Sequence, residues 1–244
     1  MIVSLYYSPT GTGRRISERI CGELGKSLNT HSKSIDFMTE HRVSFQPENT
    51  VCLAFPVYGG RIPIAFQDFE LEGNGAKAID ALVEAYDLLT ARGFCVIAAA
   101  AFIGEHSYTA RVAHGRPDQK DFVKADEFAS LVAQKLLHGQ NMTVCKITGN
   151  RPYKPYSKFL LAKHQPPDID DKVCVRCGKC VSACLTKAIS IENFKTNADL
   201  CIACGACVKA CVTGARRFSD PEIITTAAWL EETCCARKEP EWYL

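Results

Sequence analysis

The chain has 244 residues, of which 47% are hydrophobic and 23% are charged, as in an ordinary globular protein. Its 29 basic and 27 acidic residues leave a net charge of +2, which gives no electrostatic case for binding nucleic acid or an anionic membrane. The longest apolar stretch, from Phe94 to Gly104, is too short to span a bilayer, so we expect no membrane insertion. The length accommodates two domains, and without a signal peptide at the start a cytoplasmic location is expected.

The first element is the apolar run from Met1 to Tyr7, which predicts a strand buried on both faces. A loop follows, and then a helix in which Ile16, Ile20 and Leu24 recur every four residues. The sequence therefore opens with a strand, a loop and a helix.

The loop between this strand and this helix has the composition of an anion site. Ser8, Thr10 and Thr12 supply hydroxyls, and Gly11 and Gly13 leave room at the helix N-terminus, where free N–H groups and the helix dipole favour a phosphate. The loop lacks the G-K-[ST] ending of a triphosphate loop and the G-x-G-x-x-G spacing, which favours a monophosphate. The alternative is a plain turn with capping hydroxyls.

A weaker strand is predicted over residues 31–38, and a third strand begins at Thr50 and ends in a loop with Tyr58 and Gly59. An aromatic side chain at the carboxyl end of a parallel strand is placed to stack on a flat ring, although it more often packs in the core. The pattern from Ile79 to Arg92 predicts an amphipathic helix.

The next predicted element is a buried strand from Phe94 to Phe102. In the polar loop after it, His106 is a candidate ligand contact, the alternative being a solvated side chain. A long helix starting at Pro117 and ending at Gly139 comes next, and Thr143 to Gly149 predicts a last short strand.

Two cysteine runs, CVRCGKCVSAC and CIACGACVKAC, dominate the last third of the chain. Each has the spacing C-x2-C-x2-C-x3-C, which is the bacterial ferredoxin spacing for [4Fe-4S] clusters. Gly178 and Gly205 stand between the second and third cysteines of the runs, where positive φ is expected. In that arrangement the fourth cysteine of one run binds the cluster of the other run. The expected ligand sets are Cys174, Cys177, Cys180 and Cys211 for one cluster, and Cys201, Cys204, Cys207 and Cys184 for the other.

The alternatives for these runs are zinc and disulfides. Zinc sites typically use two C-x2-C pairs with a longer spacer, and disulfides are disfavoured in a reducing compartment. A proline normally follows the fourth cysteine of each run, and Leu185 and Val212 stand there instead. Of the remaining cysteines, the adjacent Cys234 and Cys235 end a predicted C-terminal helix and have no assigned role. This helix is expected to begin with a Ser219 capping box and to dock through Trp229 and Leu230.

Together, the S-x-T-G loop, the strand ending in PVYGGRIP and the two cysteine runs resemble flavodoxin–ferredoxin fusion proteins. The resemblance covers nearly the whole chain and implies an α/β fold with a flavodoxin-like doubly wound parallel sheet, followed by a small α+β two-cluster domain. It also implies FMN, with Ser8, Thr10, Gly11 and Thr12 at the phosphate and Tyr58 and Gly59 beside the ring. Gly13 replaces a usual hydroxyl residue of that loop, and His106 is a candidate for lining the flavin.

The fourth strand of that fold is expected to be shortened or missing, because only Ala76 to Ile79 is available before the predicted helix. The predicted division is a flavodoxin-like domain over residues 1–148, a linker over 149–170, a two-cluster domain over 171–218, and a C-terminal helix and tail over 219–244. The basic linker residues Arg151, Lys154, Lys158 and Lys163 either steer an acidic redox partner or keep an extended segment solvated.

The predicted function is low-potential electron transfer through two [4Fe-4S] clusters coupled to FMN, with an unidentified oxidoreductase as partner. An electron carrier is favoured over a stand-alone catalyst. Two alternatives are a flavin-dependent reductase, for which no nicotinamide fingerprint is present, and a ferredoxin whose flavodoxin-like domain serves as a flavin-free docking module.

Overall fold

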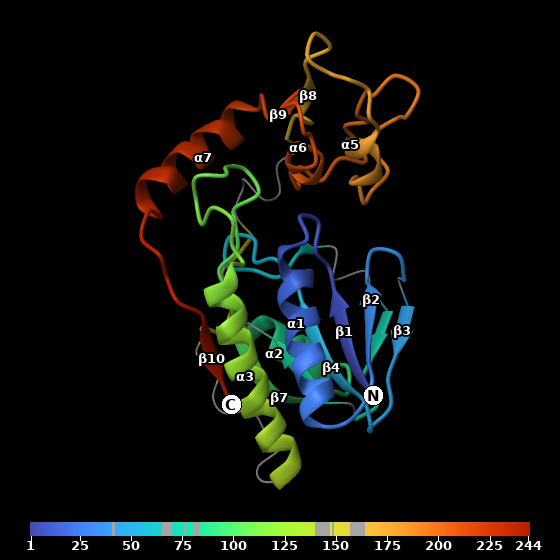
Figure 1. Cartoon of the computed structure of the whole chain (residues 1–244), viewed down its shortest axis with the longest axis vertical. Helices are drawn as coiled ribbons and strands as arrows, with labels where there is room; N and C mark the ends of the chain where they lie inside the picture. The colour runs from blue at the N-terminus through green and yellow to red at the C-terminus, as the bar shows by residue number, and fades with distance from the viewer. Residues whose placement is uncertain are drawn as a thin grey trace. The chain divides into compact units, whose positions relative to one another are not determined.

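The computed structural model describes residues 1–40, 42–64, 70–75, 77–80, 83–139, 147, 149–156 and 164–244 (Figure 1). The chain divides into two compact units that are interleaved along the sequence. The first unit comprises Met1–Ile103, Arg116–Leu160 and Lys238–Leu244, and the second comprises Gly104–Gly115 and Leu161–Arg237. The expected domains follow one another along the sequence. In the structure, Gly104–Gly115 belongs to the second unit and Lys238–Leu244 belongs to the first.

A six-stranded sheet forms the centre of the first unit, with the strand order β10-β7-β6-β4-β1-β2. Its strands are β1 (Ile2–Tyr6), β2 (Ser32–Asp36), β4 (Thr50–Ala54), β6 (Lys77–Asp80), β7 (Cys95–Ala101) and β10 (Glu241–Tyr243). The first five are parallel, and β10 pairs antiparallel with β7. Counted along the chain, the parallel strands have the order 2-1-3-4-5, which is the flavodoxin-like order. The expected fold class is thereby confirmed.

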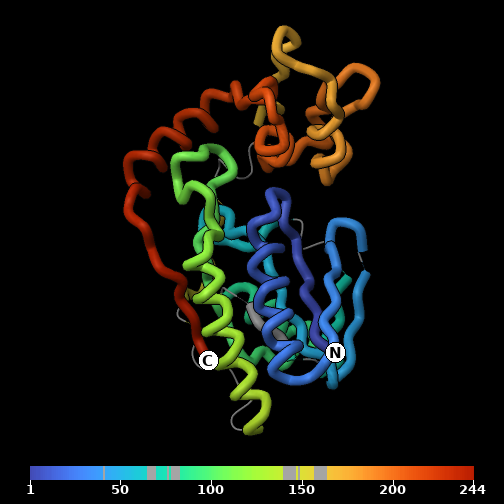
Figure 2. Tube along the Cα trace, in the orientation of Figure 1, coloured from blue at the N-terminus to red at the C-terminus, as the bar shows by residue number. Residues whose placement is uncertain are grey.

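Alternating side chains of β1 enter two hydrophobic cores, one on each face of this sheet. Val3 and Leu5 belong to a core that includes Leu89 of α2 (Val83–Ala91), whereas Ile2 belongs to a core with α1 (Thr12–Ser27) and α3 (Gln119–His138). Figure 2 shows α1 and α3 side by side on their face of the sheet. All five residues of β1 are buried, as its continuous apolar run predicts.

The fourth parallel strand is present but short. β6 has four residues, Lys77–Asp80, compared with seven in the adjacent β7. The predicted helix from Ile79 is wrong at its start, because Ile79 pairs in the sheet and α2 begins at Val83. A separate parallel pair, β3 (Arg42–Ser44) and β5 (Glu70–Glu72), packs Val43 and Leu71 onto the same core as Leu89. The strand predicted over Thr143 to Gly149 lies outside the described residues.

The second unit is small and has little regular structure. It contains the antiparallel pair β8 (Asp168–Ile169) and β9 (Arg216–Arg217), the short helices α5 (Lys179–Ser182) and α6 (Ala206–Lys209), and α7 (Pro221–Thr233). Its core is the cluster of Cys180, Ile189, Phe194 and Cys207. Two of these four are cysteines of the runs, so the predicted ligands are themselves core residues.

Helix α7 differs from its prediction at the cap and at its packing residue. Asp220, not Ser219, caps the helix, and its carboxylate accepts N–H bonds from Glu222 and Ile223. Ile223 is buried, whereas Trp229 is 59% exposed and therefore does not dock the helix on a core. None of the described helices is long and apolar enough to cross a membrane.

Candidate functional site

The two cysteine runs fold as a repeat. Each residue of the first run has a counterpart 27 positions later in the second, so that Cys174 corresponds to Cys201. Both runs form a loop that turns through a glycine in the left-handed conformation and enters a one-turn helix. Gly178 has φ 76° before α5, and Gly205 has φ 77° before α6. The prediction of positive φ at these two glycines is confirmed, and a side chain there would be strained.

Backbone N–H groups donate to the last cysteine sulfur of each run. The amide of Ala188 lies 3.2 Å from Cys184 Sγ, and the amide of Arg216 lies 3.3 Å from Cys211 Sγ. Such bonds favour the thiolate form of the cysteine. They also help to set the reduction potential of a cluster that this sulfur binds. Burial raises the pKa of the Cys211 thiol, but the bonds from Arg216, Thr213 and Ala215 outweigh it and hold the pKa below the ordinary value.

The first three thiols of the second run carry the opposite shift. Burial raises the pKa of Cys201 and of Cys204, and raises the pKa of Cys207 to about 12. Iron binds the thiolate, so binding of a cluster to these cysteines releases protons. The positive charge of the iron then offsets the cost of burying the thiolates. Without a metal, burial therefore favours the neutral form of these three thiols.

Other features of the runs bear on the zinc and disulfide alternatives. Every cysteine in the described ranges is a free thiol. Within the same ranges, no three His, Cys, Asp or Glu side chains are close enough to hold a single metal ion. A [4Fe-4S] cluster instead takes one cysteine for each iron.

The predicted phosphate loop joins β1 to α1. Gly11 is the N-cap of α1 with φ 79°, and it supplies no side-chain cap. Ser8 closes the loop, because its carbonyl accepts the Gly11 N–H and its Oγ accepts the Arg14 N–H at 3.1 Å. The Thr10 and Thr12 hydroxyls lie 3.5 Å apart. The two hydroxyls thus lie at the N-terminus of a 16-residue helix whose first turn holds no acidic residue. This end of the helix is at the carboxyl edge of the sheet, the edge that binds ligands in this fold.

The second predicted flavin loop is a tight turn. Tyr58 and Arg61 exchange two backbone hydrogen bonds of 3.0 Å around Gly59 and Gly60, both at positive φ. The Tyr58 side chain is half-buried against the core that contains Leu89. The turn therefore presents Gly59 to solvent and holds Tyr58 partly against the protein.

Arg61 anchors this turn, a role that the sequence analysis missed. Its guanidinium binds Glu84 of α2 through two hydrogen bonds of 2.6 and 2.8 Å, and its Nη1 donates to the Lys154 carbonyl. The ring of Tyr156 lies 4.0 Å from the Arg61 guanidinium carbon. The Arg61 and Glu84 side chains are 12% and 10% exposed, so this is a nearly buried ion pair.

The start of the predicted linker is also fixed on the first unit. Arg151 forms a bidentate ion pair with Asp87 of α2, and the Tyr153 hydroxyl donates to the same carboxylate. Most of residues 149–156 are exposed, but Arg151 and Tyr153 hold this stretch on α2 through Asp87. Lys158 and Lys163 lie outside the described residues.

His106 belongs to the second unit, together with the rest of the segment Gly104–Gly115. Its Nδ1 accepts the Tyr108 N–H at 3.2 Å, and the two rings pack edge to face. Burial and the nearby Lys209 charge lower the pKa of His106, which favours the neutral imidazole. Its role as a flavin contact stays a prediction.

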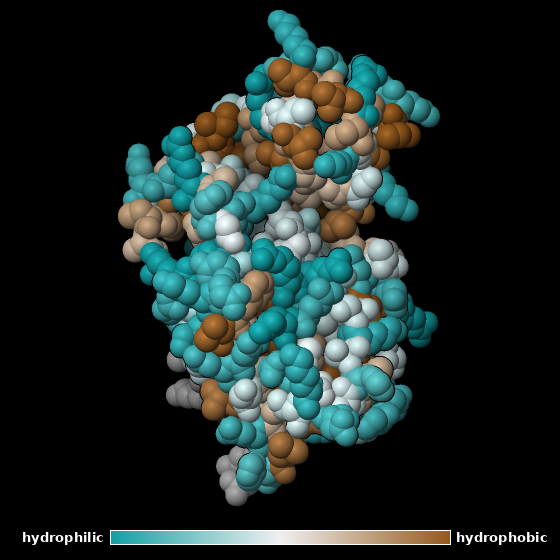
Figure 3. Space-filling view, in the orientation of Figure 1, coloured by the Kyte–Doolittle hydropathy of each residue, from teal (hydrophilic) through white to brown (hydrophobic). Residues whose placement is uncertain are grey.

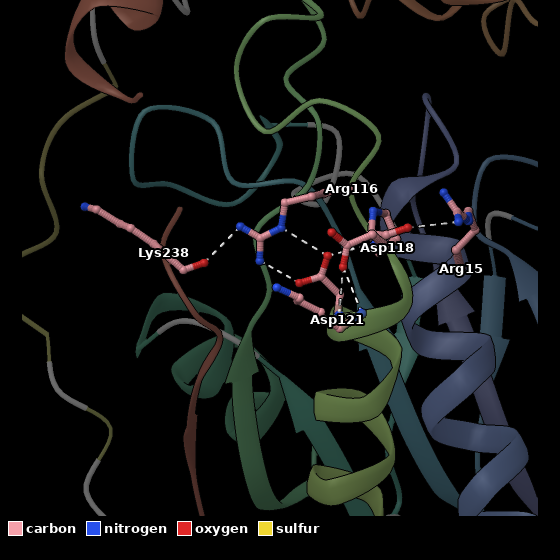
Figure 4. Close-up of polar contacts among 7 residues, drawn as sticks. Arg15, Arg116, Asp118, Asp121 and Lys238 are labelled. Carbon is pink, nitrogen blue, oxygen red and sulfur yellow. Dashed lines mark hydrogen bonds and ion pairs between the residues drawn. The ribbon is translucent and has the colours of Figure 1, made fainter. Parts of the chain in front are cut away.

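A buried ion pair orders the start of α3 and the returning chain end (Figure 4). Arg116 binds Asp121 through two hydrogen bonds of 2.6 and 3.0 Å and donates to the Lys238 carbonyl. Asp118 caps α3 in a reciprocal capping box with Asp121, and Arg15 of α1 donates to the Pro117 carbonyl. The D-x-x-D spacing is the sequence signal that would have located this cap.

Comparison with known proteins assigns the cysteine runs. Residues 166–212 match the family described as the 4Fe-4S dicluster domain, and this range holds all eight cysteines of the two runs. A flavodoxin of Streptococcus pneumoniae TIGR4 is similar to 55% of this chain and 98% of its own, with 15% identity and a TM-score of 0.35. No curated protein matches the chain. The strand order is that of the flavodoxin-like fold, and the residues that follow the fold in the chain are similar to a 4Fe-4S dicluster domain.

Proposed function

We propose that the protein carries electrons between two [4Fe-4S] clusters in the second unit and an FMN in the first unit, and exchanges them with an oxidoreductase. The observation that carries the proposal is the pair of repeated cysteine runs within a dicluster domain, each with a backbone N–H bonded to its last sulfur. Clusters of this type supply one-electron transfer at low potential. The dense free thiols fit a reducing compartment such as the cytoplasm.

In this proposal, the chain's own contribution is ligation, burial and hydrogen bonding. Cys174, Cys177, Cys180 and Cys211 hold one cluster, and Cys201, Cys204, Cys207 and Cys184 hold the other. The amides of Ala188 and Arg216 donate to the crossing ligands, Cys184 and Cys211. Because each crossing ligand belongs to the other run, loss of one cluster loosens the site of its partner.

For FMN, the β1–α1 loop is the proposed phosphate site. Ser8, Thr10 and Thr12 would donate hydroxyl hydrogen bonds to the phosphate, and Gly11 and Gly13 would let it approach the helix N-terminus. Gly59 and Tyr58 would lie beside the ring. FMN, when bound, takes up one or two electrons and thereby links one-electron and two-electron partners.

Anaerobic purification followed by iron, sulfide and flavin analysis tests this proposal. We expect about eight irons per chain, four for each [4Fe-4S] cluster, with one FMN, and Tyr58→Ala should weaken FMN binding. Far fewer than eight irons would refute the electron-transfer proposal. Eight irons without FMN uptake would refute the flavin half alone.

That last outcome would leave a ferredoxin with a docking domain, and two observations favour this alternative. β6 is short, and Tyr58 is held against the core. Both features reduce the protein surface available to a flavin ring at the sheet edge. Tight binding of a partner by the flavin-free chain would support it, whereas steady-state oxidation of NADH or NADPH would support a flavin-dependent reductase.

A further inference from the structure

The two cysteine runs are equivalent in sequence but not in their surroundings. Cys177 is exposed, whereas its counterpart Cys204 is half-buried. Gly178 is half-buried, and its counterpart Gly205 is buried. At the next position, the first run has an exposed Lys179 and the second a buried Ala206. The stretch Cys177–Lys179 of the first run is therefore more exposed than its counterpart Cys204–Ala206, which is covered by protein of the same unit.

The segment Gly104–Gly115 covers the second run. A Cβ atom placed on Gly205 would lie 2.6 Å from the Ser107 carbonyl oxygen, so the segment touches the backbone beside Cys204. The Glu105 carboxylate binds Lys209 at 2.9 Å, and the Tyr108 ring packs edge to face on Phe218. At Gly178, the same Cβ atom would meet only the Ile191 side chain, at 3.7 Å. The space beside Gly178 is therefore less crowded than the space beside Gly205.

Exposed apolar residues stand next to two of the cysteines that the first cluster would use. Val173 and Val175 flank Cys174, and Val212 follows Cys211. Val175 and Val212 are 65% and 66% exposed, which is unfavourable for a surface that always meets water. Figure 3 shows apolar side chains, in brown, on the surface of the part of the chain that holds α5 and α6.

The rim of this apolar patch is basic. Exposed Lys172, Arg176 and Lys179 lie within or next to the first run, and Arg217 lies on β9. Asp171 contacts Arg176 at 3.9 Å, and Asp170 contacts Arg217 at 3.6 Å. These four basic side chains complement a face with an apolar centre and an acidic rim.

We propose that the cluster held by Cys174, Cys177, Cys180 and Cys211 is the port through which the protein exchanges electrons with a separate redox protein. That partner docks on Val173, Val175 and Val212 with an acidic rim facing Arg176 and Lys179. In the exchange the port cluster would be oxidised by one electron, and the partner's redox centre would be reduced by that electron. This inference rests on the proposed electron-transfer function and names the partner class and the docking site.

Stopped-flow oxidation of the cluster-loaded, dithionite-reduced chain tests the port with a small anionic acceptor, tris(oxalato)cobaltate(III). At low ionic strength, Arg176→Glu with Lys179→Glu should lower the second-order rate constant by about tenfold. Hexaamminecobalt(III), a cation, should react at least as fast as with the wild type. Lys187→Glu is the matched control, because this exposed lysine lies beside Cys184, a ligand of the covered cluster. It should change either rate by less than about twofold.

The apolar part of the patch is tested with a protein acceptor of acidic surface, the soluble domain of cytochrome b5. Val175→Ser with Val212→Ser should raise the acceptor concentration at half-maximal rate by about tenfold. The matched control is Leu200→Ser with Ile202→Ser, because these side chains are 49% and 47% exposed and flank Cys201 of the other run. The control should behave like the wild type.

Two outcomes separate this proposal from the proposed function. A wild-type chain without about eight irons would refute the function itself. A fully loaded chain in which the Leu200 and Lys187 controls slow transfer as much as the Val175 and Arg176 variants would overturn only the port assignment. Iron content and visible absorption of each variant show that the clusters are intact before the rates are compared.

Discussion

At the residue scale, two glycines in the β1–α1 loop have different constraints although they stand two positions apart. Gly11 adopts φ 79°, which an L-residue enters at a cost of about 1–2 kcal/mol. Gly13 has no positive φ, and a Cβ there would meet Ser8 Oγ at 3.5 Å, an ordinary contact. The backbone therefore requires glycine at position 11 but not at position 13.

We therefore predict that Gly13→Ser strengthens FMN binding. The added hydroxyl fits the space and supplies one more donor to a dianionic phosphate, and a hydrogen bond to a charged group contributes about 1.5–3 kcal/mol. Isothermal titration of the flavin-free chain should show about tenfold or greater tightening. Gly11→Ala is the matched control and should weaken binding or stability. Unchanged affinity in Gly13→Ser would show that the phosphate does not lie at this loop.

Asp87 makes the start of the linker sensitive to acid. Hydrogen bonds from Arg151 hold the pKa of Asp87 below its ordinary value, with a further bond from Tyr153. A depressed pKa means that the ionised carboxylate stabilises the folded state above the ordinary pKa, and that this contribution is lost as pH falls through the folded-state value. Hydrogen exchange of residues 149–156 should therefore lose protection below about pH 4.

The Asp87→Asn variant separates this effect from general acid unfolding. It cannot titrate, so its residues 149–156 should exchange faster at neutral pH and change little on acidification. Protection of β1 in the same samples serves as the internal reference. An Asp87→Asn chain with the acid response of the wild type would place the titrating group elsewhere.

At the element scale, the contact between α3 and the chain end depends on the buried pair of Arg116 and Asp121. Both side chains are almost fully buried, at 4% and 0% exposure. Arg116→Ala would leave the Asp121 carboxylate buried without its cation, and we expect the first unit to lose about 3–5 kcal/mol of stability. Chemical denaturation followed by Trp242 fluorescence measures this loss, because Trp242 packs on Phe128 of α3.

A second arginine on this side of the sheet provides the control. Arg19 binds Asp126 with two bonds of 2.6 Å, but the Arg19 side chain is 43% exposed. Arg19→Ala should therefore cost less than about 1 kcal/mol. Equal effects of the two substitutions would show that burial does not determine the strength of the Arg116 pair.

Sequence patterns located the elements whose signals are local. Continuous burial of β1, the four-residue repeat of Ile16, Ile20 and Leu24, and the glycine turns of the cysteine runs all follow from near neighbours in the chain. The α2 start was misplaced because Ile79 fits both a strand and a helical repeat, and only its pairing with Ala98 of β7 decides between them. The cap of α7 was misplaced by one residue, which is within the usual ambiguity of helix ends.

The rest depends on contacts between distant segments. Nothing in the local pattern of Gly104–Gly115 indicates that this loop groups with the second unit, because Glu105 and Lys209 are 104 positions apart. Likewise, β10 is only three residues long, and all of the second unit lies between it and its partner β7 in the sequence. The bidentate partners of Arg61 and Arg151 were missed for the same reason.

At the scale of the whole molecule, the two units should respond differently to iron removal. The hydrophobic cluster of the second unit has four buried members among the described residues, two of them cysteines, whereas the first unit has two larger clusters, one on each face of its sheet. A core so small depends on its metal for stability. Chelation should therefore unfold the second unit and leave the first unit folded.

Hydrogen exchange of the full chain before and after anaerobic chelation checks this prediction. Peptides of residues 164–237 should lose protection, whereas peptides of β1, β4 and α3 should keep it. Restoring iron and sulfide should return protection to the second unit. A loss of protection in β4 at the same rate would show that the units unfold as one.

The interleaved order of the units has a consequence for synthesis. β10 is an edge strand of the first unit, yet it follows the whole second unit in the chain. On a ribosome that adds roughly 5–20 residues per second, the β7 edge waits on the order of ten seconds for its partner strand. Because the cysteine runs emerge during this interval, iron–sulfur assembly can begin before the sheet is complete. An edge left open in this period can also pair with another nascent chain.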